Sequence, residues 1–238
     1  MQVIYEDNHI IIVNKQSGEI VQGDKTGDRP LSDIVKNYIK EKYQKPGAVF
    51  LGVVHRLDRP VSGLVIFART SKALTRLNKM FAEGDVHKTY WAIVEKRKVE
   101  GGKWKEDSNE WQTAEHWLVR NEKQNKSYAY QTEKPNSKKA ILKYRMLAKG
   151  DNYNLLEVQL LTGRHHQIRC QLSTIGCPIK GDLKYGAKRS NPDGSISLQS
   201  HRIVFVHPVS KETINIEAPV PKDPLWQALA KEVTNKKS

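Results

Sequence analysis

The stretch Val54–Ala68, which reads VHRLDRPVSGLVIFA, constrains the fold of this chain more than any other. The apolar residues Leu51 and Val53 lead into it, and a second apolar run follows Gly63. Apolar runs of this length that are interrupted by turn residues such as Pro60 are typical of β-strands. The pattern therefore predicts two buried strands that present a short charged loop between them.

The charged loop carries one carboxylate, Asp58, between Arg56 and Arg59. Nearby positive charge favours the ionised form of a carboxylic acid, and loops braced by a rigid scaffold often carry functional residues. Asp58 is therefore a candidate nucleophile or base. An exposed ion pair at a strand end is the plainer interpretation of the short Arg-x-Asp pattern, and the length of the whole string argues against it.

The composition points to a polyanionic partner. The chain has 238 residues with 40 Lys and Arg against 26 Asp and Glu, which gives a net charge of +14. Such a surplus favours binding to phosphates with release of counterions, although charge alone also allows an anionic membrane surface. No segment approaches the roughly 18 consecutive apolar residues of a membrane helix, and Met1–Glu6 does not resemble a signal peptide. We expect a cytoplasmic protein without membrane contact, in which Cys170 and Cys177 are reduced packing residues.

Hydrophobic periodicity predicts the remaining elements. Strands are expected at residues 3–5, 10–13, 87–94, 140–148, 153–161, 203–206 and 213–217. Helices are expected from Pro30 to before Lys45, from Ser71 as N-cap to Gly84, at 166–175 and from Pro224. The polar segment 96–138 is expected to form hairpins and loops that decorate the core. Strands outnumber helices without regular alternation, which predicts an α+β fold with a mainly antiparallel sheet.

A second cluster of chemically active residues lies in Leu160–Arg169, which reads LLTGRHHQIR. Gly163 marks the end of a strand, and a helix begins shortly after it. Backbone N–H groups at a helix start attract anions, and Arg164 adds a fixed positive charge. The adjacent His165 and His166 diverge at a helix start and have no third ligand at a suitable spacing, so we expect no metal site.

With these residues in place, the chain resembles the RluA-type RNA pseudouridine synthases. The resemblance rests on Glu6–Asn14 with Lys15, Val54–Ala68, Lys88-Thr89-Tyr90, Thr162–Arg169, and Gly176–Asp182 with Tyr185, in the order of the family. It extends from Ile4 to about Pro221. Gln16 stands where the family usually has proline, and Arg202 stands where a small residue is common; we expect local changes there.

The resemblance implies a pseudouridine synthase fold, in which flanking helices and a mainly antiparallel sheet form a central basic cleft. It implies one catalytic domain over 1–222, with 96–138 as variable hairpin insertions, and a C-terminal helix and tail over 223–238. We expect no separate N-terminal RNA-binding domain. The implied activity is isomerisation of specific uridines to pseudouridine in ribosomal RNA, transfer RNA or both, by a monomer that needs no metal or cofactor.

The resemblance also implies roles for individual residues. Asp58 is the catalytic aspartate, Tyr90 stacks on the uracil and relays a proton at C5, and Arg169 pairs with the catalytic aspartate. Whether Asp58 attacks C1′, attacks C6 or abstracts a proton to form a glycal stays open. Arg56 occupies the space that a flipped uridine leaves. The implied RNA-contacting residues are His55, Arg56, Arg59, Lys88, Arg164 and His166.

Two other functions stay open at this stage. A non-catalytic RNA-binding or ribosome-assembly factor would use the same basic surface, but binding alone requires none of Asp58, Tyr90 and Arg169. A base-flipping glycosylase would also use an aspartate and a base pocket, and it would release free uracil. A chromatogram of the products separates a glycosylase from a synthase.

Overall fold

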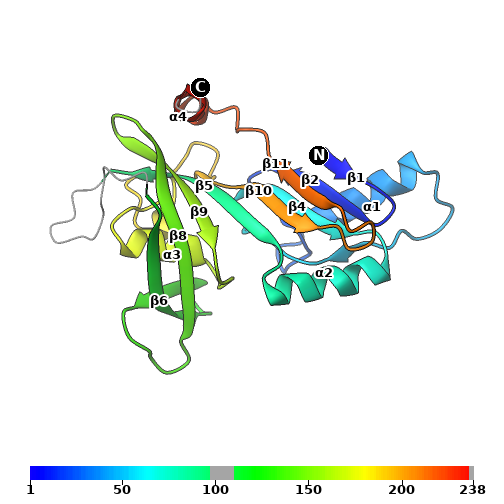
Figure 1. Cartoon of the computed structure of the whole chain (residues 1–238), viewed down its shortest axis with the longest axis horizontal. Coiled ribbons are helices and arrows are strands. Elements are labelled where there is room, and N and C mark those ends of the chain that lie inside the picture. Colours follow the sequence, from blue (N-terminus) through cyan, green and yellow to red (C-terminus); the bar gives the residue numbers. More distant parts are fainter. Residues whose placement is uncertain (97–109, 236–238) are drawn as a thin grey trace. The chain divides into compact units, whose positions relative to one another are not determined.

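The computed structural model describes residues 1–96 and 110–235, and the chain forms two compact units (Figure 1). Unit 1 comprises Met1–Lys88 and Gln199–Pro219. Unit 2 comprises Thr89–Leu198 and Val220–Ser238. The two units are described separately, and a strand that crosses the boundary is assigned to the unit that holds most of its residues.

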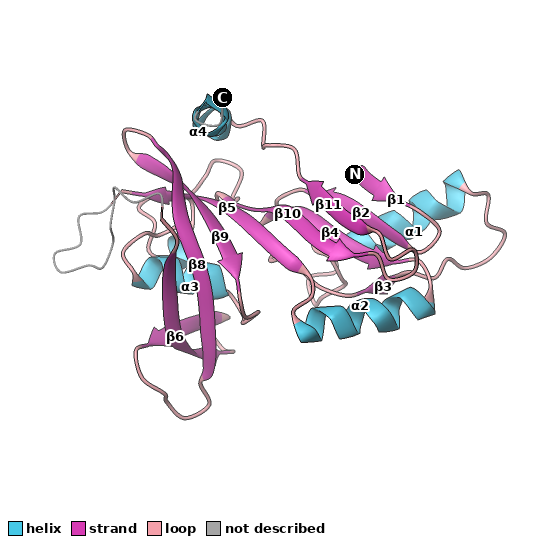
Figure 2. Ribbon diagram, viewed as in Figure 1, coloured by secondary structure: helices cyan, strands magenta, loops and turns pink. Residues whose placement is uncertain are grey.

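Unit 1 is a mixed sheet with two helices (Figure 2). Its strands are β1 (Gln2–Glu6), β2 (Ile10–Lys15), β3 (Gly52–Val53), β4 (Ser62–Ala68), β10 (Leu198–Val206) and β11 (Thr213–Glu217), and its helices are α1 (Leu31–Lys42) and α2 (Ser71–Glu83). Strand β2 pairs antiparallel with β1 and β4, and β10 pairs antiparallel with β11. The parallel contact in this sheet joins β4 to β10 through Gly63 and Ser200.

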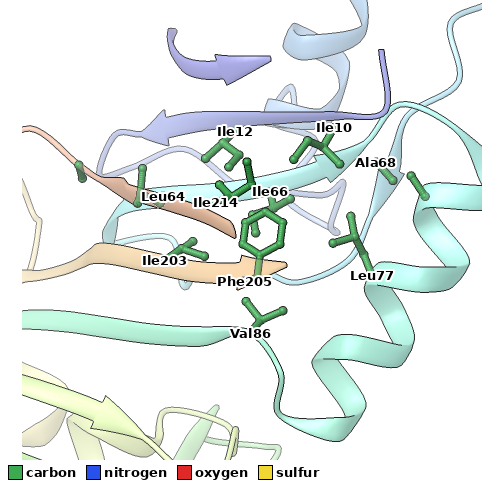
Figure 3. Close-up of a cluster of buried hydrophobic side chains, with 12 residues drawn as sticks. Ile10, Ile12, Leu64, Ile66, Ala68, Leu77, Val86, Ile203, Phe205 and Ile214 are labelled. Atoms are coloured by element: carbon green, nitrogen blue, oxygen red, sulfur yellow. The ribbon is translucent and has the colours of Figure 1, made fainter. Parts of the chain in front are cut away.

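The core of unit 1 lies between α2 and one face of this sheet. Residues of one parity along β2 and β4, such as Ile12 and Ile66, point to this face because side chains alternate along a strand. Figure 3 shows them packed with Phe205 of β10 and Leu77 of α2. The residues of opposite parity, such as Ile11, are fully buried on the other face. Burial on both faces explains why β2 and β4 read as continuous apolar runs.

Helix α2 tests the predicted helix boundaries. Gly84 ends it in the left-handed conformation, with φ of 85°, as predicted. The predicted N-cap, Ser71, is wrong by one residue. The hydroxyl of Thr70 accepts the hydrogen bond from the backbone N–H of Ala73, and Ser71 is already helical. Thr and Ser both cap well, so adjacent candidates in the sequence cannot be ranked from residue type alone.

Unit 2 is an antiparallel sheet with a helix on each face. Its strands are β5 (His87–Glu95), β6 (Gln112–Asn121), β7 (Lys126–Tyr130), β8 (Lys138–Lys149) and β9 (Tyr153–Leu160), paired in the order β5-β9-β8-β6-β7. Helix α3 (Gln167–Thr174) packs against Leu118 and Ala140 through Cys170. Helix α4 (Pro224–Asn235) packs through Trp226 against Leu155, which the strand register places on the opposite face.

The strands and helices predicted outside 96–138 are all present, and the α+β class with a mainly antiparallel sheet is confirmed. Within 96–138, β6 and β7 form the expected hairpin, and the part that falls at 97–109 lies outside the described residues. Strand β6 does more than decorate the core, because it pairs with β8 and contributes the buried Leu118. The predicted tail at 236–238 also lies outside the described residues.

Candidate active site

The loop that carries Asp58 is a tight turn between β3 and β4 of unit 1. The backbone N–H of Val61 donates to the carbonyl of Asp58 at 3.0 Å, with Pro60 inside the turn. Leu57 and Val61 are buried, whereas Asp58 is half-buried and Arg56 is exposed. The turn therefore fixes the main chain on both sides of the carboxylate.

A buried lysine, Lys15, binds the main chain of this loop. Lys15, the last residue of β2, has no exposed surface. Its Nζ donates to the carbonyls of Asp58 at 3.3 Å, Arg59 at 3.1 Å and Val61 at 2.6 Å, and to that of Gln16 at 3.0 Å. Burial lowers the pKa of Lys15 to about 8, so the ammonium is still protonated at neutral pH. The loop main chain is thus anchored on one buried cation.

Lys15 stands in the first motif of the family resemblance, but the motif does not indicate its role. The available signal was its place at the end of β2, a strand in which every residue is buried. A lysine in such a strand cannot reach water easily, and a buried ammonium requires acceptors. Which carbonyls supply them depends on the tertiary structure, and the sequence does not reveal it.

Further backbone contacts complete the anchoring. The Gly18 N–H donates to the Arg59 carbonyl at 2.9 Å, and the Ser17 hydroxyl donates to the Pro60 carbonyl at 3.2 Å. Gly63, just after the loop, has φ of +112°, and a Cβ there would lie 2.3 Å from the Ser200 carbonyl oxygen. Glycine is therefore required where β4 approaches β10.

Arg59 makes its side-chain contacts to the segment that precedes α1. Its Nη1 lies 2.6 Å from the Asp28 carboxylate and its Nη2 lies 3.7 Å from that of Asp24. The hydrogen bond to Asp28 raises the pKa of Arg59. Exposed ion pairs of this kind contribute little to stability because solvent screens them, so a phosphate can compete for the guanidinium.

His55 and Lys88 share one aromatic neighbour. The His55 ring stacks on Phe81 with centroids 4.8 Å apart, and Lys88 Nζ lies 5.1 Å from the centroid of the same ring. The Ile66 N–H donates to His55 Nε2 at 3.0 Å, which leaves the ring proton on Nδ1. Burial lowers the pKa of His55 to about 3, and it also lowers the pKa of Lys88. His55 is therefore neutral and ties the start of the loop to β4.

In unit 2, Tyr90 lies on β5 and is almost fully buried. Arg169, on α3, is also buried and forms a two-point ion pair with Asp182, at 2.7 Å from Nε and 2.9 Å from Nη2. The guanidinium also lies 5.1 Å from the centroid of the Tyr185 ring. Asp182 stands in one of the motifs that carry the family resemblance, but nothing in its local pattern indicates a partner.

His166 belongs to the interior of unit 2. The Ser127 N–H donates to the Tyr185 hydroxyl at 2.8 Å, and that hydroxyl lies 3.0 Å from His166 Nδ1. Burial lowers the pKa of His166 to about 2, so the ring is neutral. Arg164 is exposed, and its Nε donates to the Lys139 carbonyl at 2.9 Å.

The residues predicted to act together thus fall in two sets. Unit 1 carries His55, Arg56, Asp58, Arg59 and Lys88, and unit 2 carries Tyr90, Arg164, His166 and Arg169. Within residues 1–96 and 110–235, no group of three His, Cys, Asp or Glu side chains is arranged to hold a metal ion. In the same described ranges, no helix is long and apolar enough to cross a membrane.

Comparison with known proteins agrees with the predicted resemblance. The model of the RNA pseudouridylate synthase family matches residues 9–174. Ribosomal large subunit pseudouridine synthase C of Vibrio cholerae is 33% identical over 96% of this chain and 68% of its own length. Ribosomal large subunit pseudouridine synthase D of Xanthomonas campestris is 30% identical over 94% of this chain and 67% of its own length.

The same fold occurs among solved structures. Human RNA pseudouridylate synthase domain containing 4 superposes with a TM-score of 0.74, at 20% identity, over 98% of this chain and 93% of its own. The predicted pseudouridine synthase fold is thereby confirmed. Because the family match spans most of the chain, this protein belongs to the RNA pseudouridylate synthase family and is an isomerase of uridine in RNA.

Proposed function

We propose that this chain isomerises specific uridines of ribosomal RNA, transfer RNA or both, with Asp58 as the catalytic group. Ribosomal RNA is the first choice because the names of two relatives refer to the ribosomal large subunit. We further propose that it acts as a monomer in the cytoplasm and needs no cofactor.

One observation carries the assignment of Asp58. Its loop is fixed through main-chain carbonyls to the buried ammonium of Lys15, while the carboxylate itself is only half-buried. A reactive group held in one place by its surroundings does not have to be ordered during the reaction. A surface ion pair would not need an anchor of this kind.

The reaction breaks the N1–C1′ bond of uridine, turns the uracil and joins C5 to C1′. The proton on C5 is lost to solvent and N1 gains one, so the atoms of the product equal those of the substrate. A carboxylate serves as the nucleophile or base. In this proposal Tyr90 stacks on the uracil and relays the C5 proton, and Arg169, itself held by Asp182, orients and stabilises the charge of the carboxylate.

The target base must leave its stack before it can react, which costs a few kcal/mol and least in a loop. Arg56 is the exposed cation of the Asp58 loop and fits the role of filling the vacated space. Arg59 and Arg164 would contact phosphates. We propose His55, Lys88 and His166 as further RNA contacts, and the internal bonds of both histidines suggest that they support the RNA surface from within.

Tritium release from RNA labelled at C5 of uridine tests the proposal. Ribosomal and transfer RNA that lack the modification are incubated separately with wild type, Asp58→Asn, and Asp33→Asn as a matched control on the exposed face of α1. We expect release by wild type and Asp33→Asn, with chelator present, and none by Asp58→Asn despite intact RNA binding. Substantial release by Asp58→Asn would overturn the catalytic assignment. Tight binding without release by wild type would favour a binding factor.

A further inference from the structure

A basic pocket lies in unit 2 where the hairpin β6–β7 meets the turn before α3. Its volume is about 220 Å³. The lining includes three cationic side chains, Arg120, Lys138 and Arg164, and no acidic one. The remaining wall includes Gly163 and His165 of the turn. The function proposed above uses Arg164 alone from this set.

The strand register explains why these residues meet. Arg120 pairs with Ser127 of β7, and Leu118 pairs with Lys138 of β8. Directly paired residues, and residues two apart on one strand, share a face of the sheet. This is the face on which Leu118 packs against Cys170 of α3. The pocket is therefore built by regular strands and a helix start, and it does not depend on a chance approach of surface lysines.

The electrostatics of the pocket favour an anion. Arg120 pairs with the carboxylate of Glu122 at 3.7 Å, and the Glu122 side chain is 81% exposed. Arg164 is held in place by the bond from Nε to the Lys139 carbonyl. Gly163, Arg164 and His165 of the lining closely precede α3, so the positive end of the helix dipole lies near the pocket.

The pocket shares a face of the sheet with Tyr90 but lies far from it. Tyr90 of β5 pairs with Val158 of β9, which pairs with Tyr144 of β8. Tyr144 in turn pairs with Gln112 of β6, and Leu118, which lines the pocket, lies six residues after Gln112 on the same strand. With strands about 4.8 Å apart and about 3.3 Å of rise per residue, the separation is roughly 25 Å. A group bound in the pocket therefore cannot belong to the uridine that stacks on Tyr90.

We propose that this pocket binds a phosphodiester of the substrate RNA several nucleotides from the reacting uridine. The inference rests on the proposed function in taking RNA as the ligand. The pocket recognises the path of the RNA backbone and not a base sequence, because phosphate contacts position a nucleic acid without reading its bases. In this proposal Arg120 and Lys138 are RNA contacts at a defined site, which distinguishes them from the other exposed cations of the surface.

The test compares two double variants that remove the same charge. The double variant Arg120→Gln with Lys138→Gln removes two of the three cationic side chains that line the pocket. Lys143→Gln with Lys231→Gln removes two exposed cations from elsewhere in unit 2, the first of them on the opposite face of β8. All four side chains are exposed, so circular dichroism should show the wild-type fold for both proteins. Binding of a fluorescein-labelled single-stranded oligouridylate is measured by anisotropy over a range of salt concentrations.

The pocket variant is expected to bind roughly tenfold more weakly at low salt and to lose roughly 0.7 from the salt slope for each phosphate contact removed. The control variant is expected to weaken binding about twofold, with little change of slope. Equal losses for the two variants would overturn the proposal, because they would show a response to net charge alone. Tritium release by wild type is measured in parallel. Its absence would count against the proposed function, while the binding comparison would still decide the pocket.

Discussion

The two units hold their candidate catalytic residues in opposite ways. In unit 1 the Asp58 loop is fixed through its main chain, by carbonyl groups that converge on Lys15. In unit 2 Arg169 is fixed through its side chain, by the two-point ion pair with Asp182. One arrangement depends on a single buried cation and the other on a matched pair of charges.

This difference determines which substitutions each unit tolerates. A main-chain anchor places few demands on the loop side chains, so Arg56 and Arg59 are available for contacts with RNA. Loss of Lys15 removes several bonds at once, because several acceptors share one donor group. A buried charge pair fails when either member is lost, yet replacement of both members by apolar residues is often tolerated.

The largest effect is expected from Lys15→Met. The substitution keeps the side chain buried and removes this donor from four carbonyls, two of which, those of Asp58 and Arg59, keep a bond from a backbone N–H. Since an unsatisfied buried acceptor costs about 1–3 kcal/mol, we expect the free energy of unfolding to fall by roughly 4 kcal/mol. Urea denaturation measures the change. Lys36→Met, on the exposed face of α1, should cost about 0.5 kcal/mol or less. Similar losses for both variants would show that Lys15 is not an anchor.

A smaller loss is expected from Asp182→Asn, which leaves the Arg169 guanidinium buried with a neutral partner. Breaking a buried pair costs about 3 kcal/mol, again measured by denaturation in urea. Glu115→Gln is the matched control, because it breaks the exposed pair of Glu115 with Lys139, whose atoms lie 2.6 Å apart. It should cost about 1 kcal/mol or less. If Asp182→Asn costs no more than this control, the contrast between the two units fails.

The smallest effect near neutral pH concerns acid stability. The pKa values of His55, about 3, and His166, about 2, lie below the ordinary value of 6.5. The unfolded chain then binds more protons than the folded one below pH 6.5. The contribution of each neutral histidine to the free energy of unfolding should be fully present above pH 6.5. Below that pH it should fall by about 1 kcal/mol per pH unit for each histidine. His166→Gln should flatten this decline in a thermal denaturation series, whereas the exposed His87→Gln should not. An unchanged decline in His166→Gln would contradict the assignment.

The sequence predicted most elements because their signals are local. The stripe of Leu74, Leu77 and Phe81 sets the buried face of α2, and Gly84 supplies the left-handed residue that ends it. The N-cap was misplaced at Ser71 because both it and Thr70 are able to cap a helix. Strand β6 was underestimated because its polar residues alternate with the buried Ala114, His116 and Leu118 in a segment rich in charge.

The supporting contacts of the site were beyond prediction for a physical reason. Asp58, Tyr90 and Arg169 stand in recognisable motifs, so their selection required the sequence alone, and their catalytic roles stay proposals. The partners of Lys15 and Arg169 are 43 and 13 residues away in the chain, at Asp58 and Asp182. A contact of this kind depends on how strands and turns are arranged in space, which local pattern does not encode.

The central claim is that the anchored Asp58 converts uridine into pseudouridine within the RNA chain. The most direct measurement is chromatography of the nucleosides and free bases obtained after incubating unmodified ribosomal RNA with wild type and with Asp58→Asn. We predict pseudouridine from wild type, no free uracil, and neither product from Asp58→Asn. Free uracil from wild type, or pseudouridine formed at an undiminished rate by Asp58→Asn, would contradict the claim.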